Sequence, residues 1–254
     1  MAELYWYNLL LISFASSSIV FFIVLFFITA PYGRHVRKGW GPRLKNSIGW
    51  LLMELPALLV VLILYLLSPR KTELGSIVFL VLWLLHYGYR SLIYPFILRG
   101  NKRMPISIIL MGATFNTING YLQGRWLFTY APRDLYNTNW FGDYRFIIGV
   151  SIYIIGMVIN RHSDYILRNL RKPGETGYKI PRGGLYNYIS APNYFGEIIQ
   201  WFGWALATWS YAGLAFAVWT LANLAPRAWS NHKWYKSHFN DYPSNRKALI
   251  PFLW

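Results

Sequence analysis

Seven long apolar runs, separated by short polar and basic connections, divide this sequence of 254 residues. A helix rises about 1.5 Å per residue, so about 20 apolar residues cross the hydrocarbon core of a bilayer. No alternating pattern indicates a closed barrel of strands, so the runs are predicted to be helices. We predict an all-α integral membrane protein, a single polytopic domain over 1–254 built as a seven-transmembrane helix bundle. The predicted spans are 5–30, 48–68, 76–97, 105–128, 144–160, 194–208 and 211–226.

Lysine and arginine are distributed unequally among the connections. Alternate connections, beginning with 31–47, hold nineteen of them, whereas the other connections hold three. Because basic loops stay in the cytoplasm, we predict an N-terminus outside and a cytoplasmic C-terminus, with 161–193 also in the cytoplasm. The membrane would be the endoplasmic reticulum in a eukaryote or the inner membrane in a bacterium.

The formal net charge of +16 would suggest a nucleic-acid partner in a soluble protein. Here basic cytoplasmic loops account for the charge, so no nucleic-acid partner is expected, and no obligate protein partner is evident. The absence of cysteine excludes disulfides, thiolate metal sites and cysteine nucleophiles. No metal is expected.

One acidic residue, Glu54, lies inside an apolar run. A charged side chain in the middle of a membrane helix costs about 2.5–3.5 kcal/mol on insertion scales, so such a residue indicates a functional site. Glu197 is the other acid set in largely apolar sequence, near the start of a later span. A buried Glu tends toward its neutral form, in which it can donate a hydrogen bond.

Polar residues recur at helical spacing in most of the spans. Each group could simply form hydrogen bonds between helices. Because six of the seven helices offer one, we instead predict a polar cavity that opens to the cytoplasm, with Glu54 and Tyr87 deeper in the membrane. The groups are Glu54; Tyr87, Arg90 and Tyr94; Asn116, Asn119 and Gln123; Asn160, Asp164, Arg168 and Arg171; Asn193, Glu197 and Gln200; Arg227, Asn231 and Tyr235.

Basic side chains near the cytoplasmic ends of the spans are candidates to surround an anion, because Arg binds phosphate through two hydrogen bonds. A dinucleotide fits these residues, and so does a phosphorylated lipid. Neither familiar glycine-rich nucleotide loop is present. The candidates are Arg34, Arg103, Arg171, Lys172, Lys179, Arg182 and Arg227.

The chain resembles the steroid 5α-reductases along most of its length. The most specific segment is HSDYILRNLRKPGE at 162–175, within a match over 156–175. The family uses NADPH to saturate the C4–C5 double bond of 3-oxo-Δ4 steroids. Further matching segments are 50–56, 86–90, 119–124, 178–185, 193–197, 205–209 and 241–252.

The resemblance implies a cytoplasmic NADPH site and a steroid held deeper, with its 3-oxo group against the catalytic residues Glu54 and Tyr87. Hydride attack on C5 moves electron density onto the 3-oxo oxygen, where a Tyr hydroxyl can donate. The enol would then be protonated at C4 by water. Substrate-binding residues would be Trp50, Met53 and Arg90. Cofactor-binding residues would be Asn160, Asp164, Arg171, Tyr178, Asn193, Glu197, Arg227 and Tyr235, to which we add Arg34, Arg103, Lys179 and Asn231.

Three positions depart from the family pattern. Met53 stands where Gln is usual, Lys179 where Arg is common, and Asn231 where some members have His. The alternatives are a related membrane reductase of another enone lipid and a membrane methyltransferase that uses S-adenosylmethionine. A seven-span receptor or transporter would share the topology but gives no reason for the polar run at 160–182.

Overall fold

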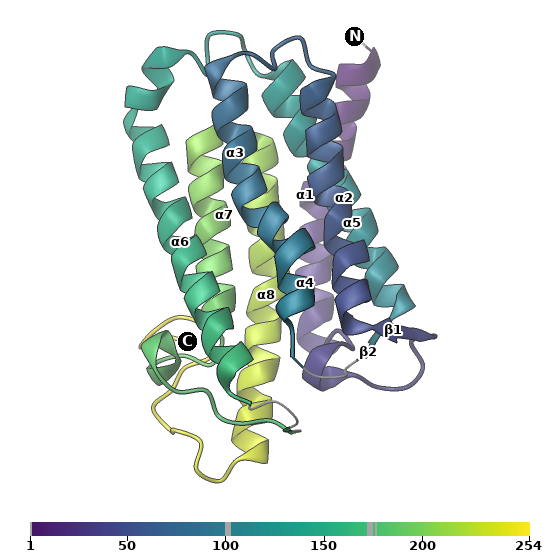
Figure 1. Ribbon diagram of the computed structural model, residues 1–254, viewed down its shortest axis with the longest axis vertical. Coiled ribbons are helices and arrows are strands. Elements are labelled where there is room, and N and C mark those ends of the chain that lie inside the picture. Colours follow the sequence, from purple (N-terminus) through teal and green to yellow (C-terminus); the bar gives the residue numbers. More distant parts are fainter. Residues whose placement is uncertain (1, 100–102, 172–174, 176) are drawn as a thin grey trace. The chain divides into compact units, whose positions relative to one another are not determined.

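The computed structural model describes residues 2–99, 103–171, 175 and 177–254, and helices make up most of this part of the chain (Figure 1). Helical stretches coincide with all seven predicted spans. The α-helices are α1 (Ala2–Phe27), α2 (Asn46–Leu66), α3 (Leu74–Gly88), α4 (Tyr94–Ile97), α5 (Ile106–Arg125), α6 (Tyr144–Asn169), α7 (Pro192–Thr208) and α8 (Tyr211–His238). Two short strands, β1 (Arg43–Lys45) and β2 (Arg103–Pro105), pair antiparallel.

Four helical stretches among the described residues are long and apolar enough to cross a membrane, judged by length and composition. They are Ala2–Phe27, Asn46–Leu66, Leu74–Ile97 and Tyr144–Asn169. The chain is thus a helical protein with the character of a membrane protein. The other three long helices are less apolar or shorter, because α5 carries the polar group 116–123, α7 has 17 residues, and α8 continues into a basic end.

A π-helical turn occurs within the predicted span 76–97, and another begins at the end of the predicted span 105–128. The first, Tyr89–Ile93, joins α3 to α4, and the second, Trp126–Tyr130, follows α5. One residue separates the end of each turn from a proline, Pro95 after the first turn and Pro132 after the second. Proline lacks an N–H and displaces the carbonyl of the fourth residue before it, which disrupts the regular ladder. The bond from Tyr94 N–H to the Tyr89 carbonyl spans five residues instead of four.

The chain forms two compact units. The first unit contains Met1–Ile12, Ala30–Ile147 and Thr208–Ala212; the second contains Ser13–Thr29, Ile148–Ala207 and Gly213–Trp254. In the first unit α2 and α5 pack together along glycines. A Cβ on Gly112 would lie 2.3 Å from the Met53 Cγ, and a Cβ on Gly120 would lie 3.3 Å from the Val60 Cβ. Small residues permit this close approach of membrane helices.

The β1–β2 pair lies directly before α2 and α5 in the chain, and it is part of the first unit. Met104, Ile108 and Ile109 form a buried cluster against which Trp40, Leu44 and Trp50 pack. Strand pairing sets Leu44 opposite Met104. This small core fixes the starts of α2 and α5 relative to each other.

In the second unit α6 and α7 touch almost backbone to backbone. A Cβ on Gly156 would lie 2.4 Å from the Gln200 nitrogen, and a Cβ on Gly196 would lie 2.5 Å from the Asn160 nitrogen. No side chain larger than hydrogen fits at these two positions without moving a helix. The α6–α7 contact therefore brings short polar side chains on the two helices within reach of each other.

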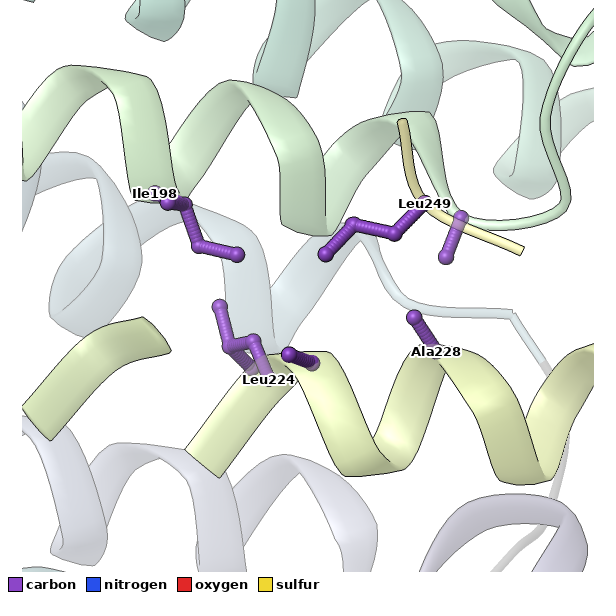
Figure 2. Close-up of a cluster of buried hydrophobic side chains, with 6 residues drawn as sticks. Ile198, Leu224, Ala228 and Leu249 are labelled. Atoms are coloured by element: carbon purple, nitrogen blue, oxygen red, sulfur yellow. The ribbon is translucent and has the colours of Figure 1, made fainter. Parts of the chain in front are cut away.

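Helix α8 and the C-terminal segment complete the second unit. Ile198 of α7 faces Leu224 of α8, and Ala228 and Leu249 continue the same apolar cluster (Figure 2). The C-terminal segment also pairs with the chain before α7, because the Ser190 N–H donates to the Lys247 carbonyl at 2.8 Å. The second half of α1, from Ser13 onward, belongs to this unit as well.

A buried hydrogen-bonded cluster holds the C-terminal segment to α8. The Ser190 Oγ lies 2.6 Å from the His232 Nδ1 and 2.6 Å from the Tyr242 hydroxyl. His232 lies beyond the predicted span 211–226. Burial, together with the positive charges of Lys236, Arg246 and Lys247, lowers the pKa of His232 to about 4. His232 is therefore a neutral hydrogen-bonding group near pH 7.

Candidate active site

Four polar side chains meet in the first unit, and all four are almost fully buried. An Arg90 Nη2 lies 3.5 Å from the Glu54 Oε1. The Asn116 Nδ2 donates to the Glu54 Oε2 at 3.4 Å, and the Tyr87 hydroxyl donates to the Asn116 Oδ1 at 3.4 Å. We call Glu54, Tyr87, Arg90 and Asn116 the polar quartet. Helices α2, α3 and α5 and the first π turn each supply one member.

Aromatic rings surround the cation of the polar quartet. The Arg90 guanidinium carbon lies 4.7 Å from the ring centroid of Trp50 and 4.7 Å from that of Tyr94. Ring faces attract a cation, most strongly where water is excluded. Arg90 thus has a negative partner on one side and two aromatic faces around it.

This ion pair gives Glu54 a cationic partner. A guanidinium within 4 Å favours the charged form of a carboxyl group, whereas burial favours the neutral form. The Glu54 oxygens lie against Arg90 and Asn116, and the Tyr87 hydroxyl donates to Asn116. The phenol O–H of Tyr87 can also donate to an oxygen of a bound molecule.

Tyr87 itself is held by its neighbours. Its ring packs on Trp83, one turn earlier in α3, at 4.6 Å between centroids. The Trp83 indole N–H donates to the Ala57 carbonyl of α2 at 3.0 Å. The Met53 side chain packs over Gly112 of α5, so its contact with a substrate stays a prediction.

A second polar cluster lies in the second unit, where α6 ends and α7 begins. The Asn160 Nδ2 donates to the Asn193 carbonyl at 2.9 Å and to the Glu197 Oε2 at 3.3 Å. The Asn193 Nδ2 donates to the Asp164 Oδ1 at 3.1 Å. The α6–α7 glycine contact explains why such short side chains bridge the helices. We call Asn160, Asp164, Asn193 and Glu197 the α6–α7 polar cluster.

Two carboxylates in this cluster suit neutral polar partners. Carboxylate oxygens accept hydrogen bonds from hydroxyl and amide groups, as an acidic residue does toward the ribose of a dinucleotide. The phosphates would need cations instead. Arg227 of α8 lies close to the start of α7, since its Nε donates to the Tyr194 hydroxyl at 3.1 Å.

The remaining predicted cofactor residues lie at several places. Tyr178 packs edge-on against Trp234 at 4.8 Å, and Tyr235 stacks on Tyr242 at 5.3 Å. Asn231 is buried on α8, close in sequence to both. These rings and the amide belong to the second unit.

The predicted cations differ in their surroundings. The Arg171 Nη1 donates to the Gly177 carbonyl at 3.4 Å, and Lys179 pairs with Glu175. Arg34 and Arg103 belong to the first unit, and their assignment to a cofactor stays a prediction. Lys172 lies outside the described residues. Among the residues that are described, no group of three or more His, Asp or Glu is placed to hold a metal ion.

Sequence reasoning found Asn116 only as part of a polar face and gave it no role in the site. It also missed Tyr194 as a partner of Arg227. A signal existed for Asn116, because it lies four residues after Gly112 and four before Gly120, on the face of α5 that meets α2.

Comparison with known proteins identifies the family of the chain. Residues 102–254 match the family described as 3-oxo-5-alpha-steroid 4-dehydrogenase. The sequence is 45% identical to 3-oxo-5-alpha-steroid 4-dehydrogenase 1 of Bos taurus over 239 residues, which is 92% of each chain. It is 48% identical to the Homo sapiens protein of the same name over 224 residues, which is 87% of this chain and 85% of the relative.

A plant relative is similar over the same range. The chain is 43% identical to the steroid 5-alpha-reductase DET2 of Arabidopsis thaliana over 239 residues, which is 91% of this chain and 90% of the relative. Animal and plant relatives thus match nearly the whole chain and share one reaction in their names. The chain belongs to the 3-oxo-5-alpha-steroid 4-dehydrogenase family and is an enzyme of the steroid 5-alpha-reductase type.

Proposed function

We propose that the enzyme uses NADPH to reduce the C4–C5 double bond of a 3-oxo-Δ4 steroid. Tyr87 donates a hydrogen bond to the 3-oxo oxygen, on which negative charge develops as C5 accepts hydride. Glu54 orients the donor, and the enol that results takes a proton from water at C4. NADPH supplies the hydride.

The polar quartet is the observation that carries this proposal. A hydroxyl donor, held by packing and placed in a buried setting, stabilises an oxyanion far better than the same group in water. Arg90 pairs with Glu54 in the same buried cluster and so helps to hold it in place. Trp50 offers an apolar surface suited to a steroid ring.

The α6–α7 polar cluster and its neighbours fit a dinucleotide better than a phosphorylated lipid. A lipid phosphate asks for cations, whereas this cluster presents two carboxylates and two amides. Asn160, Asp164, Asn193 and Glu197 would hold the hydroxyl and amide groups of the cofactor. Arg171, Arg227 and Lys179 would hold its phosphates, and a preference for NADPH over NADH follows from that surplus of cations.

The decisive experiment uses the purified protein in nanodiscs with NADPH and a 3-oxo-Δ4 steroid. NADPH absorbance should fall as a product heavier by two hydrogens appears. The matching 3-hydroxy-Δ4 steroid is the control, and it should not react because it lacks the conjugated ketone. A product that requires S-adenosylmethionine would show a methyltransferase, and reduction confined to non-steroid enones would change the substrate class.

We further propose seven transmembrane spans with the N-terminus outside and the cofactor side in the cytoplasm. The unequal distribution of Lys and Arg supports this orientation. The chain has no cysteine, so a thiol-specific label can react only with the cysteine that is introduced. Arg182→Cys, at an exposed position, should react with an impermeant label only from the cytoplasmic side, and Asn137→Cys only from the other side. The reverse pattern would overturn the orientation.

A further inference from the structure

Asn116 lies between the two groups to which the reaction is assigned, and neither composition nor the comparisons give it a role. We propose that Asn116 is a positioning residue that holds the Tyr87 hydroxyl and the Glu54 carboxylate in place for the 3-oxo group of the substrate. The inference rests on the proposed function and adds the residue through which its two key groups are aligned.

Helix packing puts Asn116 where it can do this. Gly112 and Gly120 lie one turn before and one turn after Asn116 on the same face of α5, and both face α2 closely. A Cβ on Gly120 would lie 3.6 Å from the Ala57 Cα, so the two helix backbones run close together there. A side chain as short as Asn therefore reaches the backbone of α2, where its Nδ2 donates to the Met53 carbonyl at 2.7 Å.

This anchor fixes which way the amide faces. The Met53 carbonyl oxygen can only accept, so the nitrogen of the amide must face it. The Asn116 Oδ1 then points to Tyr87 and can only accept, which makes the Tyr87 hydroxyl the donor. The phenol proton is thus already directed before a substrate is present.

The lengths of the hydrogen bonds of Asn116 distinguish its contact with the α2 backbone from its contacts with Glu54 and Tyr87. The contact to Met53 is 2.7 Å, whereas those to Glu54 and Tyr87 are each 3.4 Å. Hydrogen bonds as long as 3.4 Å are weak. Tyr87 can therefore leave Asn116 for a ketone oxygen at little cost, while the amide stays in place on the backbone.

The test replaces Asn116 by an apolar side chain of similar shape, Asn116→Leu, in the full-length protein. Single-turnover hydride transfer should slow by about tenfold or more, since a misdirected donor loses part of the stabilisation that an oxyanion donor supplies. NADPH affinity should change by less than about threefold, because Asn116 is assigned to the carbonyl end. A loss of NADPH affinity equal to the loss of rate would overturn the role.

Asn119→Leu is the matched control. Asn119 is buried on the same helix and accepts from Gln123 at 3.2 Å, one turn away from the quartet. Its substitution removes a buried amide in the same way, and it should leave the rate of hydride transfer near normal in protein that folds. Asn116→Ser replaces Asn116→Leu if the latter does not fold, because its hydroxyl is too short to reach Tyr87 and Glu54.

A double-mutant comparison separates positioning from general support of the fold. If Asn116 acts through Tyr87, Asn116→Leu should slow the Tyr87→Phe enzyme much less than it slows the wild type. Additive effects would refute the positioning role. If Tyr87→Phe alone reacts normally, the proposed function fails; if only Tyr87→Phe is slow and Asn116→Leu is normal, the present inference fails and the function stands.

Discussion

Replacing Gly156 by alanine tests how the α6–α7 contact supports the proposed cofactor site. The added Cβ would lie 2.4 Å from the Gln200 nitrogen and 2.5 Å from the Gly196 oxygen. Ordinary contact begins at 3.4 Å. The backbone atoms involved cannot rotate away, so the helices must separate by about 1 Å, as overpacked cores do when they shift backbone.

The size of the effect follows from that separation. The bond from the Asn160 Nδ2 to the Asn193 carbonyl is 2.9 Å long, and an extra 1 Å or so takes it beyond hydrogen-bonding range. Overpacking costs about 1–3 kcal/mol, which lowers the melting temperature of a chain of this size by about 2–12 °C. Loss of aligned polar groups worth about 1.4 kcal/mol would weaken NADPH binding about tenfold.

The assay measures thermal unfolding and NADPH affinity on the same purified samples. Gly88→Ala is the control, because a Cβ there meets nothing within 4 Å and alanine is favoured over glycine in a helix by up to about 1 kcal/mol. That variant should melt at the wild-type temperature or slightly higher. If Gly156→Ala melts like the wild type and binds NADPH normally, the close-packing argument is wrong. If it melts early but binds normally, the α6–α7 polar cluster does not hold the cofactor.

Three further outcomes are expected. Tyr87→Phe and Glu54→Gln should each slow single-turnover hydride transfer by about 10²–10³ with nearly unchanged NADPH affinity, and a normal rate for Tyr87→Phe would contradict the mechanism. Asp164→Ala and Arg171→Ala should do the reverse and raise the dissociation constant of NADPH first, as measured by titration at constant steroid. The pKa of His232 is about 4 in the folded protein, against an ordinary value of 6.5. Between pH 4 and pH 6.5 His232 is therefore protonated in the unfolded chain and neutral in the folded chain. The melting temperature should therefore fall as pH drops from 6.5 to 4, and it should fall less in His232→Gln; an identical pH dependence in both proteins would exclude His232 as the cause.

The positions of the helices follow from hydrophobic runs, but their local geometry does not. Runs of apolar residues predicted α1 and α2 to within a few residues, because a membrane span has few other ways to satisfy its backbone. The π turns before Pro95 and Pro132 were not predicted. A proline indicates that the regular helical hydrogen bonding is interrupted, but it does not determine which local geometry results. The polar ends of α6 and α8 also extend beyond the predicted spans, because hydropathy marks the membrane and not the end of the helix.

The candidate site, like the fold, was predicted from the sequence only in part. Spacing and resemblance identified Glu54, Tyr87 and Arg90 as neighbours, and the structure brings them together. The contact between Glu54 and Arg90 could not be derived, because the periodicity of a helix gives a face but not the distance to a cation. The hydrogen bonds by which Asn116 connects Tyr87 and Glu54 could not be predicted either. They depend on the short distance between α2 and α5, which the glycines of α5 permit.

The second half of α1 packs in the second unit against residues that are synthesised much later than α1 itself. The Phe14 carbonyl of α1 accepts from the Trp219 indole of α8 across a sequence separation of 205 residues. The Thr29 hydroxyl, two residues beyond the end of α1, lies 3.0 Å from the Ser230 hydroxyl of α8, 201 residues away. At about 5–20 residues per second, a ribosome needs about 10–40 s to supply those partners after α1 has been synthesised. Throughout that interval the second half of α1 is exposed to lipid or to the insertion machinery. A chain truncated before Trp219 therefore lacks the α8 residues that contact the second half of α1.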